Sequence, residues 1–174
     1  DSKTSVKCLE KGKNSLFYAG NDSGELFTYN LDTMSSRDTP SLLVRTFDFK
    51  DGKSITKVIA DDNCTTIVGR KDSVISFYDL EANKVSRECE LTEKAFVVDM
   101  KFIQSVGGGF SNSFVSVDDT GKLNVFDARV KARSFGMKLN PVMGIPTSLV
   151  ECSKLFGQFY MATNRGYLTR YDLR

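Results

Sequence analysis

The sequence predicts an all-β fold built from repeated four-stranded antiparallel sheets. A dipeptide made of an aromatic residue and Asp or Asn recurs along the chain, and each copy closes the same strand–turn–strand pattern. Successive copies are 49, 48 and 45 residues apart, with aromatic residues at Tyr29, Tyr78, Phe126 and Tyr171. A period of about 20 to 50 residues is typical of stacked supersecondary units.

A turn residue precedes each of these aromatic residues by five positions. The four residues are Gly24, Ser73, Gly121 and Gly166. Glycine adopts positive φ without steric cost, so three glycines in four copies fit the tight turn of a β-hairpin. Apolar runs on both sides of each turn predict the paired strands, at 16–18 and 25–28, 66–68 and 74–77, 114–116 and 122–125, and 159–161 and 167–170.

Further strands flank each hairpin. An inner strand is expected before each hairpin, at 5–9, 54–59, 96–102 and 145–150, and outer strands are expected between units, at 42–47, 85–91 and 133–139. No segment has a sustained apolar period of 3.6 residues, so we expect no long helix. A four-stranded unit of about 45 residues is typical of one blade of a β-propeller.

The repeats predict a single propeller segment over residues 1–174. Its approximate units are 1–30, 41–79, 84–127 and 133–174. Propellers close with about 4 to 8 blades, and each terminal blade of an open stack exposes a flank that a neighbour normally covers. We therefore expect an incomplete ring, which the remainder of a propeller or a second copy of the chain would complete.

The repeat resembles that of the WD-repeat β-propeller family. Tyr-Asn, Tyr-Asp, Phe-Asp and Tyr-Asp stand in place of the Trp-Asp dipeptide, and the chain contains no Trp and no His. The Gly-His dipeptide of the family is therefore absent, and its Asp-His-Ser/Thr-Trp network cannot form. The Asp of that network falls six residues before the aromatic residue, where only Asp72 matches. The resemblance implies a divergent member whose blades depend on apolar packing.

A fainter resemblance is to the WD domain of the kinase-like regulatory subunit of the endosomal phosphatidylinositol 3-kinase complex. It rests on Val97 to Met100, on Gly121 to Arg129, on Thr147 and Ser148, and on the last unit. It implies a protein–protein interaction scaffold within a multiprotein complex of membrane trafficking, in contact with the membrane only indirectly.

The last two units end in the pattern Asp-x-Arg. The residues are Asp127 with Arg129, and Asp172 with Arg174. This tandem pattern resembles the box of WD-repeat substrate receptors of cullin-type ubiquitin ligases, in which the Arg helps to present a docking surface to the adaptor. The resemblance makes these four residues candidates for partner binding. A local ion pair at each strand end is the alternative interpretation.

The composition favours a protein that is not an enzyme. General acid–base chemistry near neutral pH depends most often on His, and the chain has none. No two cysteines lie closer than 25 residues, which excludes a Cys-x-x-Cys metal or redox site at Cys8, Cys64, Cys89 and Cys152. We expect packed thiols, with no catalytic residue, no metal site and no cofactor.

The charge does not indicate a nucleic-acid partner. The net charge is +2 and the isoelectric point is near 8.3, whereas dedicated nucleic-acid binders are more basic. No apolar run reaches the roughly 18 residues that span a bilayer, and no signal peptide is recognisable. We expect a cytoplasmic or nuclear protein whose partners are other proteins. Cationic residues expected in loops are further candidates for contacts, namely Arg37, Arg70, Lys71 and Arg165.

Overall fold

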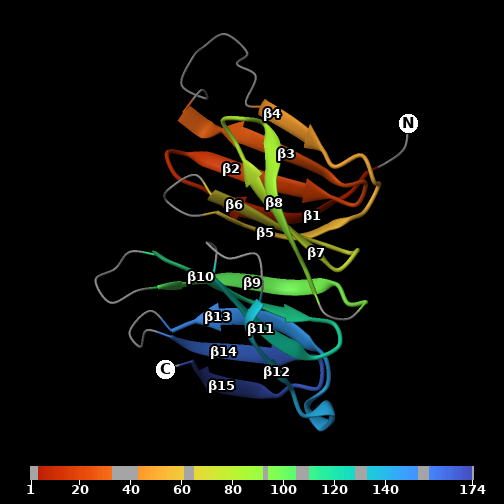
Figure 1. Ribbon diagram of the computed structural model, residues 1–174, viewed down its shortest axis with the longest axis vertical. Helices are drawn as coiled ribbons and strands as arrows, with labels where there is room; N and C mark the ends of the chain where they lie inside the picture. The colour runs from red at the N-terminus through yellow and green to blue at the C-terminus, as the bar shows by residue number, and fades with distance from the viewer. Residues whose placement is uncertain are drawn as a thin grey trace.

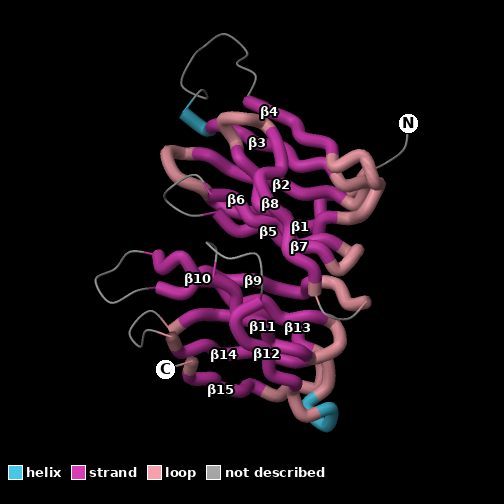
Figure 2. The backbone as a smooth tube through the Cα atoms, in the orientation of Figure 1, coloured by secondary structure: helices cyan, strands magenta, loops and turns pink. Residues whose placement is uncertain are grey.

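Four antiparallel sheets follow one another along the long axis of the molecule (Figure 1). The structure is a computed structural model, and it describes residues 4–32, 43–60, 65–91, 94–104, 110–127, 133–152 and 157–173. Strands dominate these ranges, as Figure 2 shows. The longest helical segment within them is one 3₁₀ turn at Pro141–Met143. The all-β fold and the expected lack of a long helix in these ranges are confirmed.

Each sheet consists of strands that are consecutive in the chain. Sheet I contains β1 (Val6–Lys11), β2 (Leu16–Asn21), β3 (Glu25–Asn30) and β4 (Leu43–Asp48). Sheet II contains β5 (Ile55–Ala60), β6 (Thr65–Arg70), β7 (Val74–Asp79) and β8 (Lys84–Glu90). Sheet III contains β9 (Val97–Gln104), β10 (Phe110–Asp118), β11 (Lys122–Asp127) and β12 (Arg133–Lys138). The described part of sheet IV contains β13 (Pro146–Glu151), β14 (Gln158–Thr163) and β15 (Leu168–Asp172).

The sheets are offset by one strand from the units expected from the sequence. The strand that opens each of the last three units, β4, β8 or β12, is the outer strand of the preceding sheet. Each of these strands pairs with the strand that carries the aromatic dipeptide. A sheet therefore begins at its inner strand, and the inner strands β1, β5, β9 and β13 contact one another in chain order.

The turn residue has positive φ in all four sheets, as expected. The angles are 87° at Gly24, 68° at Ser73, 80° at Gly121 and 80° at Gly166. A residue with a side chain is strained in this conformation. The hydroxyl of Ser73 accepts a hydrogen bond from the Ala95 backbone N–H at 2.9 Å, which helps to hold sheet II in this turn.

A short polar side chain ties three of these hairpins to the inner strand of the same sheet. Backbone N–H groups at or just before the inner strand donate to it: Ser5 to Asp22 at 2.9 Å, Phe96 to Asp119 at 2.8 Å, and Ile145 to Asn164 at 2.9 Å. The acceptors all lie seven residues before the aromatic residue. This repeat was not predicted, although its spacing was visible in the sequence.

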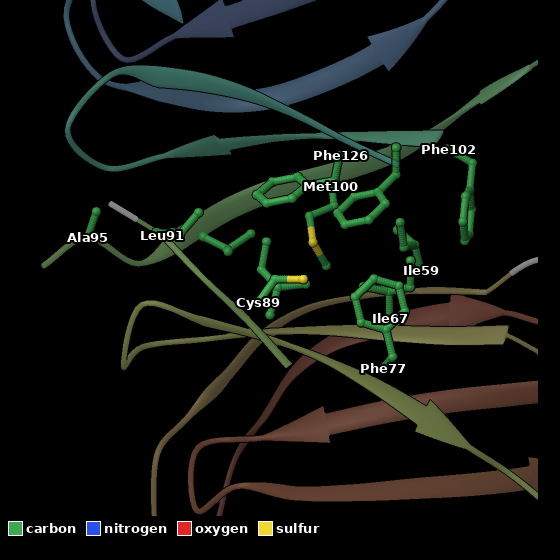
Figure 3. Close-up of a cluster of buried hydrophobic side chains, with 12 residues drawn as sticks. Ile59, Ile67, Phe77, Cys89, Leu91, Ala95, Met100, Phe102 and Phe126 are labelled. Atoms are coloured by element: carbon green, nitrogen blue, oxygen red, sulfur yellow. The ribbon is translucent and has the colours of Figure 1, made fainter. Parts of the chain in front are cut away.

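The hydrophobic core lies between successive sheets rather than within one of them. Figure 3 shows the cluster between sheets II and III. In this cluster the ring centroids of Phe77 and Phe114 are 5.8 Å apart. Phe114 in turn stacks on Phe126 with ring centroids 4.9 Å apart. Cys89 is buried in the same cluster, as expected for a packed cysteine. Similar clusters join sheets I and II and sheets III and IV.

Candidate functional site

Two faces of the stack have no neighbouring sheet among the described residues. Side chains alternate between the two faces of each strand, so every sheet has a leading face toward the preceding sheet and a trailing face toward the following one. We call the leading face of sheet I the leading flank, formed by Val6, Leu9, Phe17, Phe27 and Tyr29. We call the trailing face of sheet IV the trailing flank, formed by Val150, Tyr160, Ala162 and Leu168.

The leading flank exposes positions that are buried in the other sheets. Val6 is 62% exposed and Leu9 is 63% exposed. By strand register their equivalents in sheet II are Ile55 and Val58, and both are completely buried against sheet I. The equivalents in sheet III are also completely buried, and they are Val97 and Met100.

The trailing flank shows the same contrast. Leu168 is 71% exposed and occupies the third position before the aromatic residue. At this position the other three sheets carry apolar side chains that are at most 1% exposed, namely Leu26, Ile75 and Leu123. Val150 on the inner strand of sheet IV is also exposed. The apolar residues at these positions are therefore suited to a packed interface, but on this flank they are exposed to solvent.

The repeated aromatic residues differ in burial according to this arrangement. Tyr78 and Phe126 lie on the leading faces of sheets II and III and are buried by the preceding sheet. Tyr171 packs against the core between sheets III and IV. Tyr29 is only half-buried, and its ring lies 6.4 Å from that of Phe27. Aromatic groups with one wet side are typical of protein interfaces.

A small residue in each of the first two sheets receives the first residue of the next inner strand. A Cβ placed on Gly20 would lie 2.4 Å from Cγ2 of Ile55, and one on Gly69 would lie 2.9 Å from Cβ of Val97. Close approach of two sheets therefore requires glycine at these positions. On the trailing flank the equivalent residue is Ala162, which is larger by one methyl group, and in sheet III it is the buried Val117.

Arg70 lies in an ion cluster between sheets I and II. It is 5% exposed, and its guanidinium nitrogens lie 2.6 Å from Asp51, 3.0 Å from Asp72 and 3.4 Å from Glu88. The guanidinium also lies over the Phe49 ring at 4.9 Å. The expectation that Arg70 is an exposed loop contact is therefore wrong, because the residue ends strand β6 inside an interface. Asp72, the one residue that matches the hydrogen-bond network of the WD-repeat family, forms an ion pair with Arg70 instead.

The other cationic candidates lie at the surface where the structure describes them. Lys71 is exposed, and its ammonium lies 5.8 Å from the Phe96 ring centroid. Arg165 is exposed and donates to the Val142 carbonyl at 3.1 Å. Arg37 lies outside the described residues. These positions support no ranking of loop contacts.

Charged side chains of mixed sign line the inner strands. Asp99 on β9 is buried, accepts a hydrogen bond from the Leu149 N–H at 2.7 Å, and lies 3.0 Å from the Lys57 ammonium. It therefore ties sheets II, III and IV together. Burial raises the pKa of the nearby Glu10 carboxyl above its ordinary value, while Lys101 and Lys57 oppose this shift. Glu10 and Lys101 both line a hollow of about 320 Å³.

The two Asp-x-Arg sites lie at equivalent strand ends of successive sheets. Asp127 ends β11 opposite Ser113, and Asp172 ends β15 opposite Gln158. The Gln158 side-chain amide donates a hydrogen bond to Asp172 at 3.0 Å. Arg129 and Arg174 lie outside the described residues, so the docking hypothesis stays a prediction.

The described residues contain no group of three or more His, Cys, Asp or Glu side chains arranged to hold a metal ion. Among the described cysteines, Cys8 and Cys152 are partly buried and Cys89 is buried, and Cys64 lies outside the described residues. Within the same ranges, no helix has the length and apolar character needed to cross a membrane.

Antiparallel sheets that pack face to face, with adjacent inner strands, define the blades of a β-propeller. The solved structures similar to this chain include the crystal structure of the computationally designed Ika4 protein, with a TM-score of 0.75 and 16% identity over 100% of this chain and 94% of that chain. They also include the crystal structure of the WD40 β-propeller domain of Doa1, with a TM-score of 0.77 and 14% identity over 98% of this chain. This chain spans about half of the Doa1 chain, at 51%. No protein-family model and no curated protein matches the sequence.

Proposed function

We propose that this chain is a non-catalytic protein–protein interaction scaffold within a multiprotein complex. The exposure of the two flanks carries the proposal. Val6, Leu9 and Leu168 are each more than 60% exposed at positions that the other sheets bury. Contiguous exposed apolar positions mark interaction sites in soluble proteins. Because function depends on sites rather than on the fold, these flanks are the surfaces to test.

The buried ionisable groups support a structural role for the interior. The Arg70 cluster joins sheets I and II, and Asp99 joins sheets II, III and IV. In both places the charges hold sheets together. The faint resemblance to the regulatory subunit of the endosomal kinase complex makes components of membrane trafficking the first candidates for partners.

Affinity capture followed by reconstitution tests the scaffold function. We expect the tagged chain to retain one or more proteins that a Leu9→Glu, Leu168→Glu double variant loses, because a charge on each flank opposes burial against a partner. Val142→Glu is the control, since Val142 is 63% exposed and lies in the 3₁₀ turn between β12 and β13, outside the strands that form the flanks. Retained proteins must then bind the purified chain in titration calorimetry. Equal recovery by the wild-type chain and the double variant would contradict the proposal.

A second candidate function is a substrate receptor of a cullin-type ubiquitin ligase. The equivalent placement of Asp127 and Asp172 at successive strand ends favours it. If the Arg side chains dock an adaptor, an Arg129→Ala, Arg174→Ala double variant loses adaptor binding in a pull-down with purified components. Lys71→Ala removes an exposed charge elsewhere and is expected to leave binding intact. Adaptor binding that survives the double substitution excludes this function.

A further inference from the structure

We propose that the leading and trailing flanks bind a second copy of this chain, so that two copies close one ring. The trailing flank of each copy packs on the leading flank of the other. The inference rests on the proposed function, because it takes the flanks to be interaction surfaces, and it adds the identity of the occupant. It concerns the chain of residues 1–174 as a purified protein.

The curvature of the stack favours two copies. The chain superposes along nearly its whole length on half of a propeller domain, and a propeller arranges its blades around a central channel. Because the matched part is 51% of that chain, we take four sheets to cover about half a turn. A head-to-tail interface closes into a ring when the rotations add up to a full turn. Two copies meet this condition and give a ring of eight sheets.

The two flanks also have the composition of an interface that the chain already forms three times. Between sheets I and II, Leu26 and Tyr18 of the trailing face pack with Ile55 and Val58 of the leading face. On the trailing flank, Leu168 and Tyr160 occupy the positions of Leu26 and Tyr18. On the leading flank, Val6 and Leu9 occupy the positions of Ile55 and Val58. A contact between the flanks would thus repeat the apolar cluster of the internal interface.

Two further positions fit this arrangement. Ile55 packs over Gly20 in the internal interface, and the same step between copies places the smaller Val6 over the larger Ala162. Phe77 lies 5.8 Å from Phe114 between sheets II and III. The corresponding pair between copies is Arg170 with Phe17, and a guanidinium over an aromatic ring is favourable. An exposed cation therefore meets a half-buried ring.

Light scattering coupled to size-exclusion chromatography tests the inference. We expect the wild-type chain to have twice its own mass of 19.4 kDa at concentrations up to about 100 μM, well above the dissociation constants of most stable interfaces. Val6→Glu and Leu168→Glu are each expected to give the monomer mass. Both residues are more than 60% exposed in the single chain, so neither substitution disturbs its core. Val142→Glu, at a similarly exposed residue, should remain a dimer.

A charge-pair variant tests which flanks meet. Val6→Lys combined with Leu168→Glu places opposite charges across each proposed interface, and we expect it to restore at least part of the dimer that Leu168→Glu loses. Loss of the dimer in Val6→Glu but not in Leu168→Glu indicates contact between two leading flanks and overturns the ring. A mass above two chains overturns it as well. A wild-type monomer overturns it and leaves the scaffold function testable by capture, whereas a dimer that retains no other protein overturns only the scaffold function.

Discussion

Replacing Gly20 with alanine is expected to lower the free energy of unfolding by about 2 to 3 kcal/mol, the upper part of the range of about 1 to 3 kcal/mol for overpacking a closely packed core. The added Cβ would lie 2.4 Å from Cγ2 and 2.8 Å from Cβ of Ile55, and 2.9 Å from the Cys8 sulfur. The Ile55 atoms belong to a branched side chain at the start of β5, so they move only if sheets I and II separate. Chemical denaturation followed by circular dichroism measures the loss.

Two companion variants show whether crowding between the sheets is the cause. Gly166→Ala has nothing within 4 Å of the new Cβ, but φ is +80°, so only backbone strain of about 1 kcal/mol is expected. Ile55→Ala removes Cγ2, and in the Gly20→Ala background it should cost less than in the wild-type chain. Equal losses for Gly20→Ala and Gly166→Ala would show that close approach of Ile55 does not determine the stability.

Replacing Asp99 with alanine is expected to destabilise the chain by about 3 kcal/mol, because it breaks a buried charge network. The carboxylate accepts the Leu149 N–H at 2.7 Å and lies 3.0 Å from the Lys57 ammonium. Its loss leaves a buried N–H of sheet IV without its acceptor and leaves the ammonium of sheet II unpaired. Denaturation gives the free energy, and amide hydrogen exchange at Leu149 reports the local effect.

Asp99→Asn separates the two contributions. The amide oxygen can still accept the Leu149 N–H, but the negative charge is gone, so we expect about half of the loss seen with alanine. Lys57→Met removes the ion pair and leaves the hydrogen bond to sheet IV in place. Exchange at Leu149 should accelerate in Asp99→Ala and stay slow in Lys57→Met. Identical exchange in the two variants would contradict a tether between sheets III and IV through Asp99.

The strands and their turns could be predicted because their signals are local. Alternating apolar residues define a strand over a few positions, and the need for positive φ places glycine at three of the four hairpin turns. The aromatic dipeptide then sets the register of the repeats. Open flanks were expected from the number of units alone. The strand register then identifies Val6, Leu9 and Leu168 as residues of these flanks.

The contacts between sheets could not be predicted in the same way. Asp99 and Leu149 are 50 residues apart, and nothing near either residue indicates that they meet. Arg70 looked like a loop cation because charged residues are usually exposed, yet three carboxylates from different segments allow it to be buried. The Asx residues that fasten the hairpins had a visible spacing at Asp22, Asp119 and Asn164, and a comparison of the repeats at that position would have found them.

The consecutive strand order within each sheet has a consequence for synthesis on the ribosome. Each strand pairs only with its neighbours in the chain, so a sheet can form as soon as its last strand has left the exit tunnel. Its trailing face then waits in solvent until the next inner strand emerges. The nascent chain therefore presents one apolar surface after another, each for the time needed to translate the following hairpin, and these intervals are where a chaperone would act.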